Sequence, residues 1–287
     1  MSEKTTRTVY GMYLQTCAHL NIPFVMAPNT TLNELLSIQA GVIPDANVYP
    51  TLGYLSFGNG GLTADISADG TLVMMPKIYK ADSASLYNPI PLILRAIGDD
   101  ITPDRRAKYA GRRVESRNGV SYIAYYLKRI DKSQIKAGMF LTTVVNGVKN
   151  TVPFVPDSSV LHPVAPVISN PGVITADGTY ISASAPLNVV LDALDTEELL
   201  NVFDIIYANP NAAIISEMAI CSGLDKSITI TDPGGSQFTM NEAIAVQVND
   251  LVNIGAPLQF NADGVTFSID IGATEPLFSS TVATASS

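Results

Sequence analysis

The sequence predicts an α+β fold with two mixed domains that hold antiparallel sheets, β-hairpins and short amphipathic helices. Three observations indicate this class. Turn dipeptides of the Asn-Gly or Asp-Gly type stand between segments with strand propensity, and such dipeptides favour two-residue hairpin turns. Elsewhere, apolar residues recur at helical spacing behind capping residues. A proline-rich passage separates two stretches of opposite charge.

The helix signals are clearest in the C-terminal half. Residues 197–208 are expected to form an amphipathic helix ended by Asn209-Pro210, because four apolar residues recur at helical spacing: Leu199, Val202, Phe203 and Ile206. A second helix is expected behind the capping-box pair Thr239 and Glu242, with Gly255 just past its end.

Strands are expected between and after these two helices. Residues 227–231 suit a short strand, and residues 212–221 suit either a strand or a helix. The turn at Asp263-Gly264 predicts a hairpin whose register sets Phe260 opposite Phe267 and Leu258 opposite Ile269. Turn chemistry and apolar alternation agree on that register.

The N-terminal half has a more mixed pattern. Thr31 with Glu34 caps a short helix expected to end at Gly41, and residues 51–57 suit a strand. A helix is expected to start at Thr102-Pro103-Asp104 and to stop at Gly111. Two hairpins should follow, with turns at Asn118-Gly119 and Asn146-Gly147.

Proline density suggests where the chain divides. Residues 153–172 hold five prolines, a density that favours extended backbone and suits a semi-rigid linker. We therefore expect a mixed domain over residues 1–152 and an acidic domain over residues 173–287 that folds on its own and ends in a flexible tail. A long surface loop within one domain would have the same composition.

Charge is segregated along the chain. Residues 77–149 carry 14 Lys or Arg against 6 Asp or Glu, whereas residues 150–287 carry one base, Lys226, against 15 acids. A basic middle and an acidic end suit head-to-tail assembly, because the potential of one subunit then orients the next. The alternative is that the two stretches neutralise each other within one chain.

The expected subunit interface sets a basic group against an acidic one. Arginine pairs with carboxylates through two hydrogen bonds, which suits such a contact. The basic group is Arg105, Arg106, Lys108, Arg112, Arg113 and Arg117, and the acidic group is Asp192, Asp195, Glu197 and Glu198. A solvated helix face is the alternative. Nucleic acid is less favoured, because the whole chain is acidic and carries no recognised nucleic-acid-binding motif.

Composition also favours burial against other chains. Charged residues are 15% of the sequence, whereas soluble domains average about 25%, and the mean hydropathy is +0.23. No apolar stretch approaches the roughly 18 residues of a membrane span, and the N-terminus lacks the apolar core of a secretory signal. We expect a protein made in the cytoplasm, without a membrane partner, in which Cys17 and Cys221 are buried free thiols.

Catalytic signals are weak, so the protein is expected to be neither an enzyme nor a cofactor binder. His19 and His162 are the only histidines and have no sequence partners that mark a nucleophile or metal site. The loop at residues 58–61 is rich in glycine but lacks the Lys-Ser/Thr pair of a phosphate-binding loop. Residues 65–70 begin like a calcium loop, yet Pro76 stands where a bidentate Glu is required, so a hairpin turn is favoured.

Four passages spread over most of the chain resemble a family of virion structural proteins from tailed bacteriophages: Tyr54 to Gly61, Ile101 to Ala110, Tyr122 to Asp131, and Gly272 to Phe278. The resemblance implies a non-enzymatic protein of the virion that forms a homo-oligomeric ring in the neck, tail or baseplate and contacts other virion proteins. No catalytic residues come with it. A receptor-binding or capsid decoration protein and a particle-associated enzyme remain alternatives.

Overall fold

The structure is a computed structural model that describes residues 4–164, 178–231, 235, 237–259 and 264–277. It is largely β, with 50% strand and 19% helix, and its sheets are antiparallel. The fold is therefore largely β, and it agrees only loosely with the α+β class expected from the sequence. The α-helices are α1 (Val9–Leu20), α2 (Leu32–Leu36), α3 (Pro103–Arg106) and α4 (Ala193–Tyr207), and the 3-10 turns are Pro28–Thr30, Ser158–Leu161 and Pro210–Ala212.

The chain divides into two compact units, each assembled from two separate segments. Unit 1 comprises residues 1–131 and 191–265, and unit 2 comprises residues 132–190 and 266–287. The observed division differs from the expected one, because the proline-rich residues 153–172 fall inside unit 2. Residues 1–131 and 191–265 share one core instead, since their strands alternate in the same sheet.

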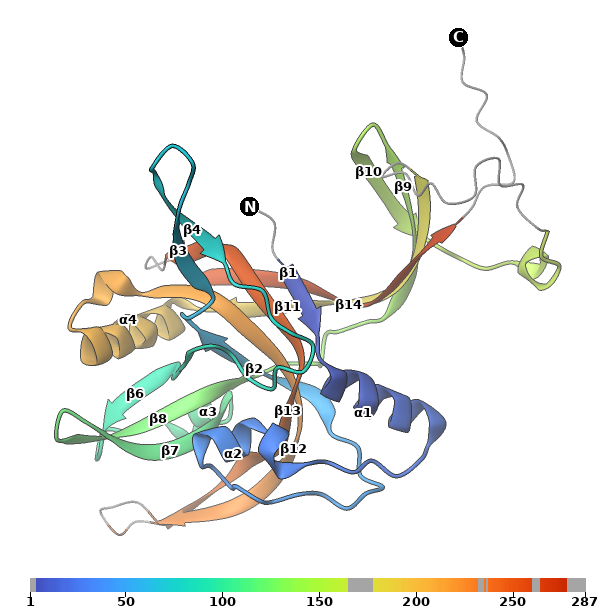
Figure 1. Cartoon of the computed structure of the whole chain (residues 1–287). Coiled ribbons are helices and arrows are strands. Elements are labelled where there is room, and N and C mark those ends of the chain that lie inside the picture. The colour runs from blue at the N-terminus through green and yellow to red at the C-terminus, as the bar shows by residue number, and fades with distance from the viewer. Residues whose placement is uncertain (1–3, 165–177, 232–234, 236, 260–263, 278–287) are drawn as a thin grey trace. The chain divides into compact units, whose positions relative to one another are not determined.

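Unit 1 contains an eight-stranded antiparallel sheet (Figure 1). Its main path runs β1-β13-β12-β2-β8-β6, with β5 on β2 and β7 on β8. The strands are β1 (Lys4–Arg7), β2 (Thr51–Gly58), β5 (Pro89–Ile90), β6 (Ile93–Ala96), β7 (Tyr109–Arg117), β8 (Val120–Arg129), β12 (Ile214–Thr231) and β13 (Gln237–Gln259). The expected strand over residues 51–57 is confirmed, and residues 227–231 form the end of β12.

Three helices pack on this sheet at defined strands. Helices α1 and α2 contact β13, and α4 contacts β6. The side chain of Thr8 caps α1, and Gly11 lets that helix lie close to β13, because a Cβ there would come within 2.7 Å of Asn249 Cα. Helix α1 has no counterpart among the expected elements. The expected helix at 197–208 is confirmed as α4, which begins earlier because Asp192 is its N-cap.

The helix expected behind Thr239 and Glu242 is wrong, because this segment is the long strand β13. Residues 242–249 are all buried, so the strand is covered on both faces and need not alternate apolar and polar residues. Apolar residues such as Ile244 and Val248 then also fall four apart, which imitates a helical period. The Glu242 carboxylate accepts hydrogen bonds from the backbone N–H groups of Gly111 and Arg112, at 2.6 and 2.9 Å, instead of capping a helix.

Two other helices are shorter than expected. Helix α2 starts behind the cap Thr31 but ends at Leu36, because Ser37 adopts a left-handed conformation with φ of 55°. Helix α3 is a single turn behind the cap Thr102. The chain enters β7 at Tyr109, so Gly111 lies within a strand and does not end the helix.

The hairpins with Asn-Gly turns are confirmed. Asn118 and Gly119 have φ of 52° and 80° and join β7 to β8. Asn146 and Gly147 have φ of 51° and 76° and join β9 (Gly138–Val145) to β10 (Val148–Pro153). Both turns thus use the positive φ values that a two-residue turn of this type requires.

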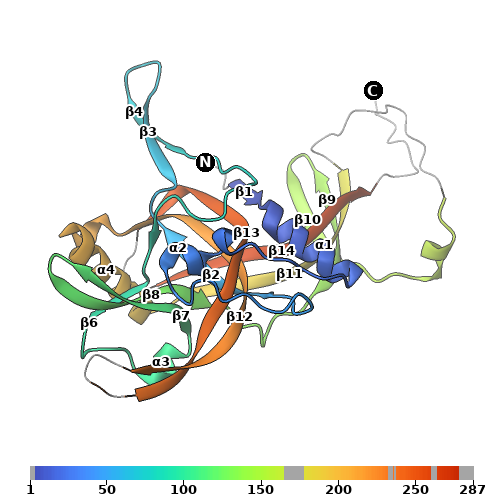
Figure 2. The same ribbon diagram turned by 60° about the horizontal axis from the view of Figure 1, so that its bottom comes forward.

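A third hairpin joins β3 (Leu62–Ile66) to β4 (Leu72–Pro76) in unit 1. It forms a separate two-stranded sheet and projects from the rest of the unit (Figure 2). Gly70 occupies its turn with φ of 83°. The segment that imitates a calcium loop is therefore a hairpin turn.

Unit 2 contains a four-stranded antiparallel sheet of order β10-β9-β11-β14. Its strands are β9 (Gly138–Val145), β10 (Val148–Pro153), β11 (Gly178–Leu191) and β14 (Val265–Leu277). Phe260 and Asp263 of the expected Asp263-Gly264 hairpin lie outside the described residues. The strands that flank the expected turn join different sheets, because Leu258 pairs with Ile215 of β12, whereas β14 pairs with β11.

Candidate functional site

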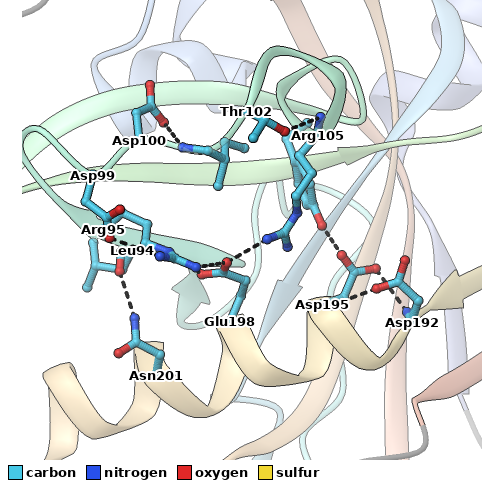
Figure 3. Close-up of polar contacts among 12 residues, drawn as sticks. Leu94, Arg95, Asp99, Asp100, Thr102, Arg105, Asp192, Asp195, Glu198 and Asn201 are labelled. Carbon is cyan, nitrogen blue, oxygen red and sulfur yellow. Dashed lines mark hydrogen bonds and ion pairs between the residues drawn. The ribbon is translucent and has the colours of Figure 1, made fainter.

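The acidic residues of α4 make their polar contacts within unit 1. The side chain of Asp192 accepts a hydrogen bond from the Asp195 backbone N–H at 2.9 Å, and the Asp195 carboxylate accepts one from the Asp192 N–H in return. This capping box fixes the start of the helix. It also places Asp195 and Glu198 on the buried face of α4, next to the basic residues of the sheet (Figure 3).

Glu198 is the centre of the first ion cluster. Its carboxylate is 3% exposed and accepts two hydrogen bonds from Arg95, at 2.6 and 3.0 Å. Arg105 donates a third at 2.9 Å from the other side, as Figure 3 shows. Two arginines on one buried carboxylate leave a net positive charge, and Asp99 accepts a hydrogen bond from Arg95 at 3.0 Å. The cluster ties α4 to β6 and to the single turn of α3.

Asp195 is the centre of a second cluster. Lys128 of β8 donates to it at 2.7 Å, and the hydroxyl of Tyr109 donates to its other oxygen. Both Lys128 and Asp195 are buried. Burial and the neighbouring Asp195 charge both raise the pKa of Tyr109 above its usual range. This hydroxyl therefore stays protonated and acts as a hydrogen-bond donor.

Asp100 is the centre of a third cluster, on the loop before α3. It accepts hydrogen bonds from Arg106 at 3.1 Å, from Arg112 at 3.3 Å and from the Tyr125 hydroxyl at 2.9 Å. The guanidinium of Arg106 also lies over the ring of Phe238, 3.9 Å from its centroid. Contacts of this kind between a cation and a ring face are attractive.

The remaining arginines of the basic group pair with Glu115. Arg113 and Arg117 each approach its carboxylate to 2.6 Å, and Tyr126 donates to it at 2.8 Å. Burial raises the pKa of Glu115, but the hydrogen bonds from Tyr126, Arg117 and Arg113 outweigh burial and lower that pKa below its usual range. The carboxylate is therefore held in its charged form.

These contacts give most residues of the expected subunit interface a partner within their own chain, and the interface itself stays a prediction. Five of its basic residues, Arg105, Arg106, Arg112, Arg113 and Arg117, bind carboxylates of their own chain. Of these five, only Arg105 pairs with the acidic group, through Glu198, whereas the other four pair with Asp100 and Glu115 of the basic stretch itself. Lys108, Asp192 and Glu197 of the expected set are exposed with no ion pair among the described residues, and for them an interface role stays a prediction.

Glu217 on β12 is a buried polar centre that sequence patterns do not indicate. It is fully buried, and its carboxylate accepts hydrogen bonds from the backbone N–H groups of Gly60 at 2.9 Å, Asn88 at 2.8 Å and Tyr87 at 3.1 Å. The hydroxyl of Tyr79 is a fourth donor. The glycine-rich loop at residues 58–61 is therefore held by this carboxylate. Neighbouring backbone fills the space beside Gly61, where a Cβ would lie 2.4 Å from the Ser216 carbonyl oxygen.

The residues with catalytic potential are not gathered into one site. His19 and His162 are both exposed. Cys17 and Cys221 are buried free thiols, as expected, and burial raises the pKa of Cys221. Within the described residues, no group of three or more His, Cys, Asp or Glu side chains is arranged to hold a metal ion.

Two exposed surfaces have the properties of contact regions. On the β3–β4 hairpin, alternate residues place an apolar set on one face: Leu62, Ala64, Ile66, Leu72, Met74 and Pro76. Ile66 and Leu72 at the far end are 70% and 68% exposed. On unit 2, one face of the four-stranded sheet forms a groove of about 680 Å³ lined by aromatic, hydroxyl and charged side chains, among them Phe140, Tyr180, Ser182, Lys149 and Asp270.

Among the described residues, no helix is both long enough and apolar enough to cross a membrane.

Comparison with known sequences places the chain in a family. The match covers residues 1–286, and the chain belongs to this family of unknown function, DUF7208. No curated protein and no solved structure matches the chain.

Proposed function

We propose that the protein is a non-enzymatic structural component of a tailed-phage virion, which assembles into a ring in the neck, tail or baseplate. Its partners are further copies of itself and other virion proteins, and it is made in the bacterial cytoplasm before it enters the particle. The proposal needs neither a cofactor nor a membrane or nucleic-acid partner.

The exposed apolar surface is the observation that carries this proposal. The projecting β3–β4 hairpin exposes Ile66, Leu72 and Met74, and the unit 2 sheet exposes Val148 and Val152. An isolated two-stranded hairpin is only marginally stable in water, and large exposed apolar patches mark contact sites. Packing against neighbouring subunits would bury both surfaces. The resemblance of four passages to virion proteins supplies the kind of particle.

The groove on unit 2 favours a second candidate, a receptor-binding or decoration protein. Its volume of about 680 Å³ is in the range of ligand sites, and such sites combine aromatic surface with a few polar groups. An enzyme of the particle is favoured by no observation of this kind, because the buried carboxylates of unit 1 are each held by several donors of the same chain.

Labelling of the protein in purified virions tests the role in the particle. The chain is tagged near its C-terminus, and electron microscopy with gold-conjugated antibody locates it. Labels at the neck, tail or baseplate are expected. Labels spread over the capsid would support the decoration protein instead, and particles that lack the chain altogether would refute a virion role.

A further inference from the structure

The sheet of unit 2 ends in two open edges within its described strands. Strands β9 and β11 lie in the middle, and β10 and β14 each have one neighbour. An open edge presents a row of backbone N–H and C=O groups that can pair with another strand. Proteins commonly protect such edges with short strands, bulges or inward-pointing charges. Strand β14 is instead 13 residues long and alternates apolar and polar residues from Val265 to Asp270.

The two edges carry opposite charges on the same face. Lys149 of β10 and Asp270 of β14 both line the groove, and both are exposed. Strands β9 and β11 separate them within one chain, a span of about 14 Å for strands spaced about 4.8 Å apart. An ion pair requires an approach within about 4 Å. Lys149 and Asp270 are therefore out of reach of each other in one sheet.

The opposite face of both edges is largely apolar, with Asn150 between the two valines of β10. On β10, Val148 and Val152 flank this face and are 71% and 44% exposed. On β14, Ile269 and Ile271 alternate with Asp270 and so point to the other side. Each edge thus has one face with a charged residue and one largely apolar face. The charged residue is basic on β10 and acidic on β14, so the two edges are complementary.

We propose that β14 of one copy pairs with β10 of the next copy and continues the sheet from subunit to subunit. In this contact Asp270 of one chain lies beside Lys149 of its neighbour. The antiparallel register set by this pair places Ile271 beside Val148 and Phe267 beside Val152. Cross-strand pairs of both kinds stabilise a sheet. The inference rests on the proposed role in an oligomer and specifies its contact.

A second copy fits these edges better than an unrelated partner, because each copy carries both members of the complementary pair. Two different edges in contact make a head-to-tail interface, which closes into a ring when the rotation between subunits allows it. The charge segregation seen in the sequence then acts through one residue on each edge, while the arginines of unit 1 stay paired in their own chain.

Charge reversal tests this contact with the full-length protein. Lys149→Asp and Asp270→Lys each place like charges in the contact, and self-association should weaken by about tenfold at low salt. The double variant Lys149→Asp/Asp270→Lys restores opposite charges, and so does an equimolar mixture of the two single variants. Both should associate like the wild type. Lys136→Asp is the matched control, because Lys136 is exposed in unit 2 outside the sheet, and it should leave association unchanged.

Sedimentation velocity over a range of concentrations measures association, and circular dichroism confirms that each variant is folded. Recovery in the mixture separates a contact between copies from a defect within one chain. Single variants that associate like the wild type would overturn the edge contact while leaving the virion role intact. A wild-type chain that stays monomeric throughout would also overturn self-pairing, and incorporation of the same variants into particles would then show whether another virion protein occupies the edges.

Discussion

Unit 1 and unit 2 differ in how much apolar surface they bury. Unit 1 covers both faces of its central strands, and residues 242–249 of β13 are buried without interruption. Unit 2 contributes only Val144, Leu187 and Val189 to the buried apolar side chains of the described residues. Because a stable domain normally needs at least two packed layers, unit 1 has a core of its own, whereas the described sheet of unit 2 buries little apolar surface.

The two units differ in the same way in the burial of their charged side chains. Carboxylates of unit 1 such as Glu198 and Glu217 are buried and held by several donors. Removing one partner from such a cluster leaves an uncompensated charge in the interior. In unit 2, Lys149 and Asp270 are exposed. Charge in unit 1 therefore specifies the fold, whereas charge in unit 2 is free to specify a partner.

The largest effect is expected from separating strands that share the core of unit 1. A fragment of residues 173–280 contains β12 and β13 but lacks β2, the neighbour of β12. It also lacks Leu55 and Phe57, which are fully buried. We expect this fragment to show no cooperative thermal transition, in contrast to the full-length chain. Circular dichroism at increasing temperature measures this, and a sharp transition in the fragment would show that the acidic end folds on its own.

Local signals in the sequence predicted the elements that local chemistry controls. The Asn118-Gly119 and Asn146-Gly147 turns and helix α4 formed as expected, because their turn and capping preferences act within a few residues. Strand β13 was read as a helix, because its partners β1 and β12 are set by the tertiary fold. The division into units could not be read from proline density for the same reason, since each unit joins segments far apart in the chain.

The charge clusters were partly predictable. Net charge along the chain indicated which groups are complementary, and Arg105 with Glu198 is such a pair. Whether the partner belongs to the same chain depends on the placement of α4 against β6, which sequence spacing does not encode. Glu217 left no signal, because a single glutamate in an apolar strand has many possible donors until the fold brings Gly60, Tyr87 and Asn88 to it.

The cores of the two units can be compared by truncating one buried side chain in each. Phe203 of α4 is fully buried in unit 1, and Phe203→Ala should lower the free energy of unfolding by about 3–5 kcal/mol. Val144→Ala in unit 2 removes two methyl groups and should cost about 1.5 kcal/mol. Leu194→Ala is the control on α4, because Leu194 is 52% exposed. Urea denaturation measures all three, and equal costs for Phe203→Ala and Val144→Ala would contradict the contrast between the two cores.

The smallest of these effects concerns the carboxylate of Glu217. In Glu217→Gln, one oxygen can still accept from the N–H groups of Gly60 and Asn88, but the amide nitrogen then faces the N–H of Tyr87. The N–H of Tyr87 keeps a hydrogen bond to the Tyr79 hydroxyl at 3.3 Å. The free energy of unfolding should therefore fall by about 1 kcal/mol, the low end of the cost of a buried donor that loses its acceptor.

Glu197→Gln provides the matched control for Glu217→Gln, because Glu197 is exposed on α4 and surface changes of this kind usually stay within about 0.5 kcal/mol. Hydrogen exchange adds a local readout that global stability does not give. The amide of Tyr87 should show the largest increase in exchange rate in Glu217→Gln. Those of Gly60 and Asn88 should increase less, because the amide oxygen that they retain is a weaker acceptor than a carboxylate. The amides of β9 and β11 in unit 2 should exchange at the wild-type rate. Unchanged exchange at Gly60 and Asn88, with unchanged stability, would mean that the loop at residues 58–61 is held by its own backbone contacts and not by the carboxylate.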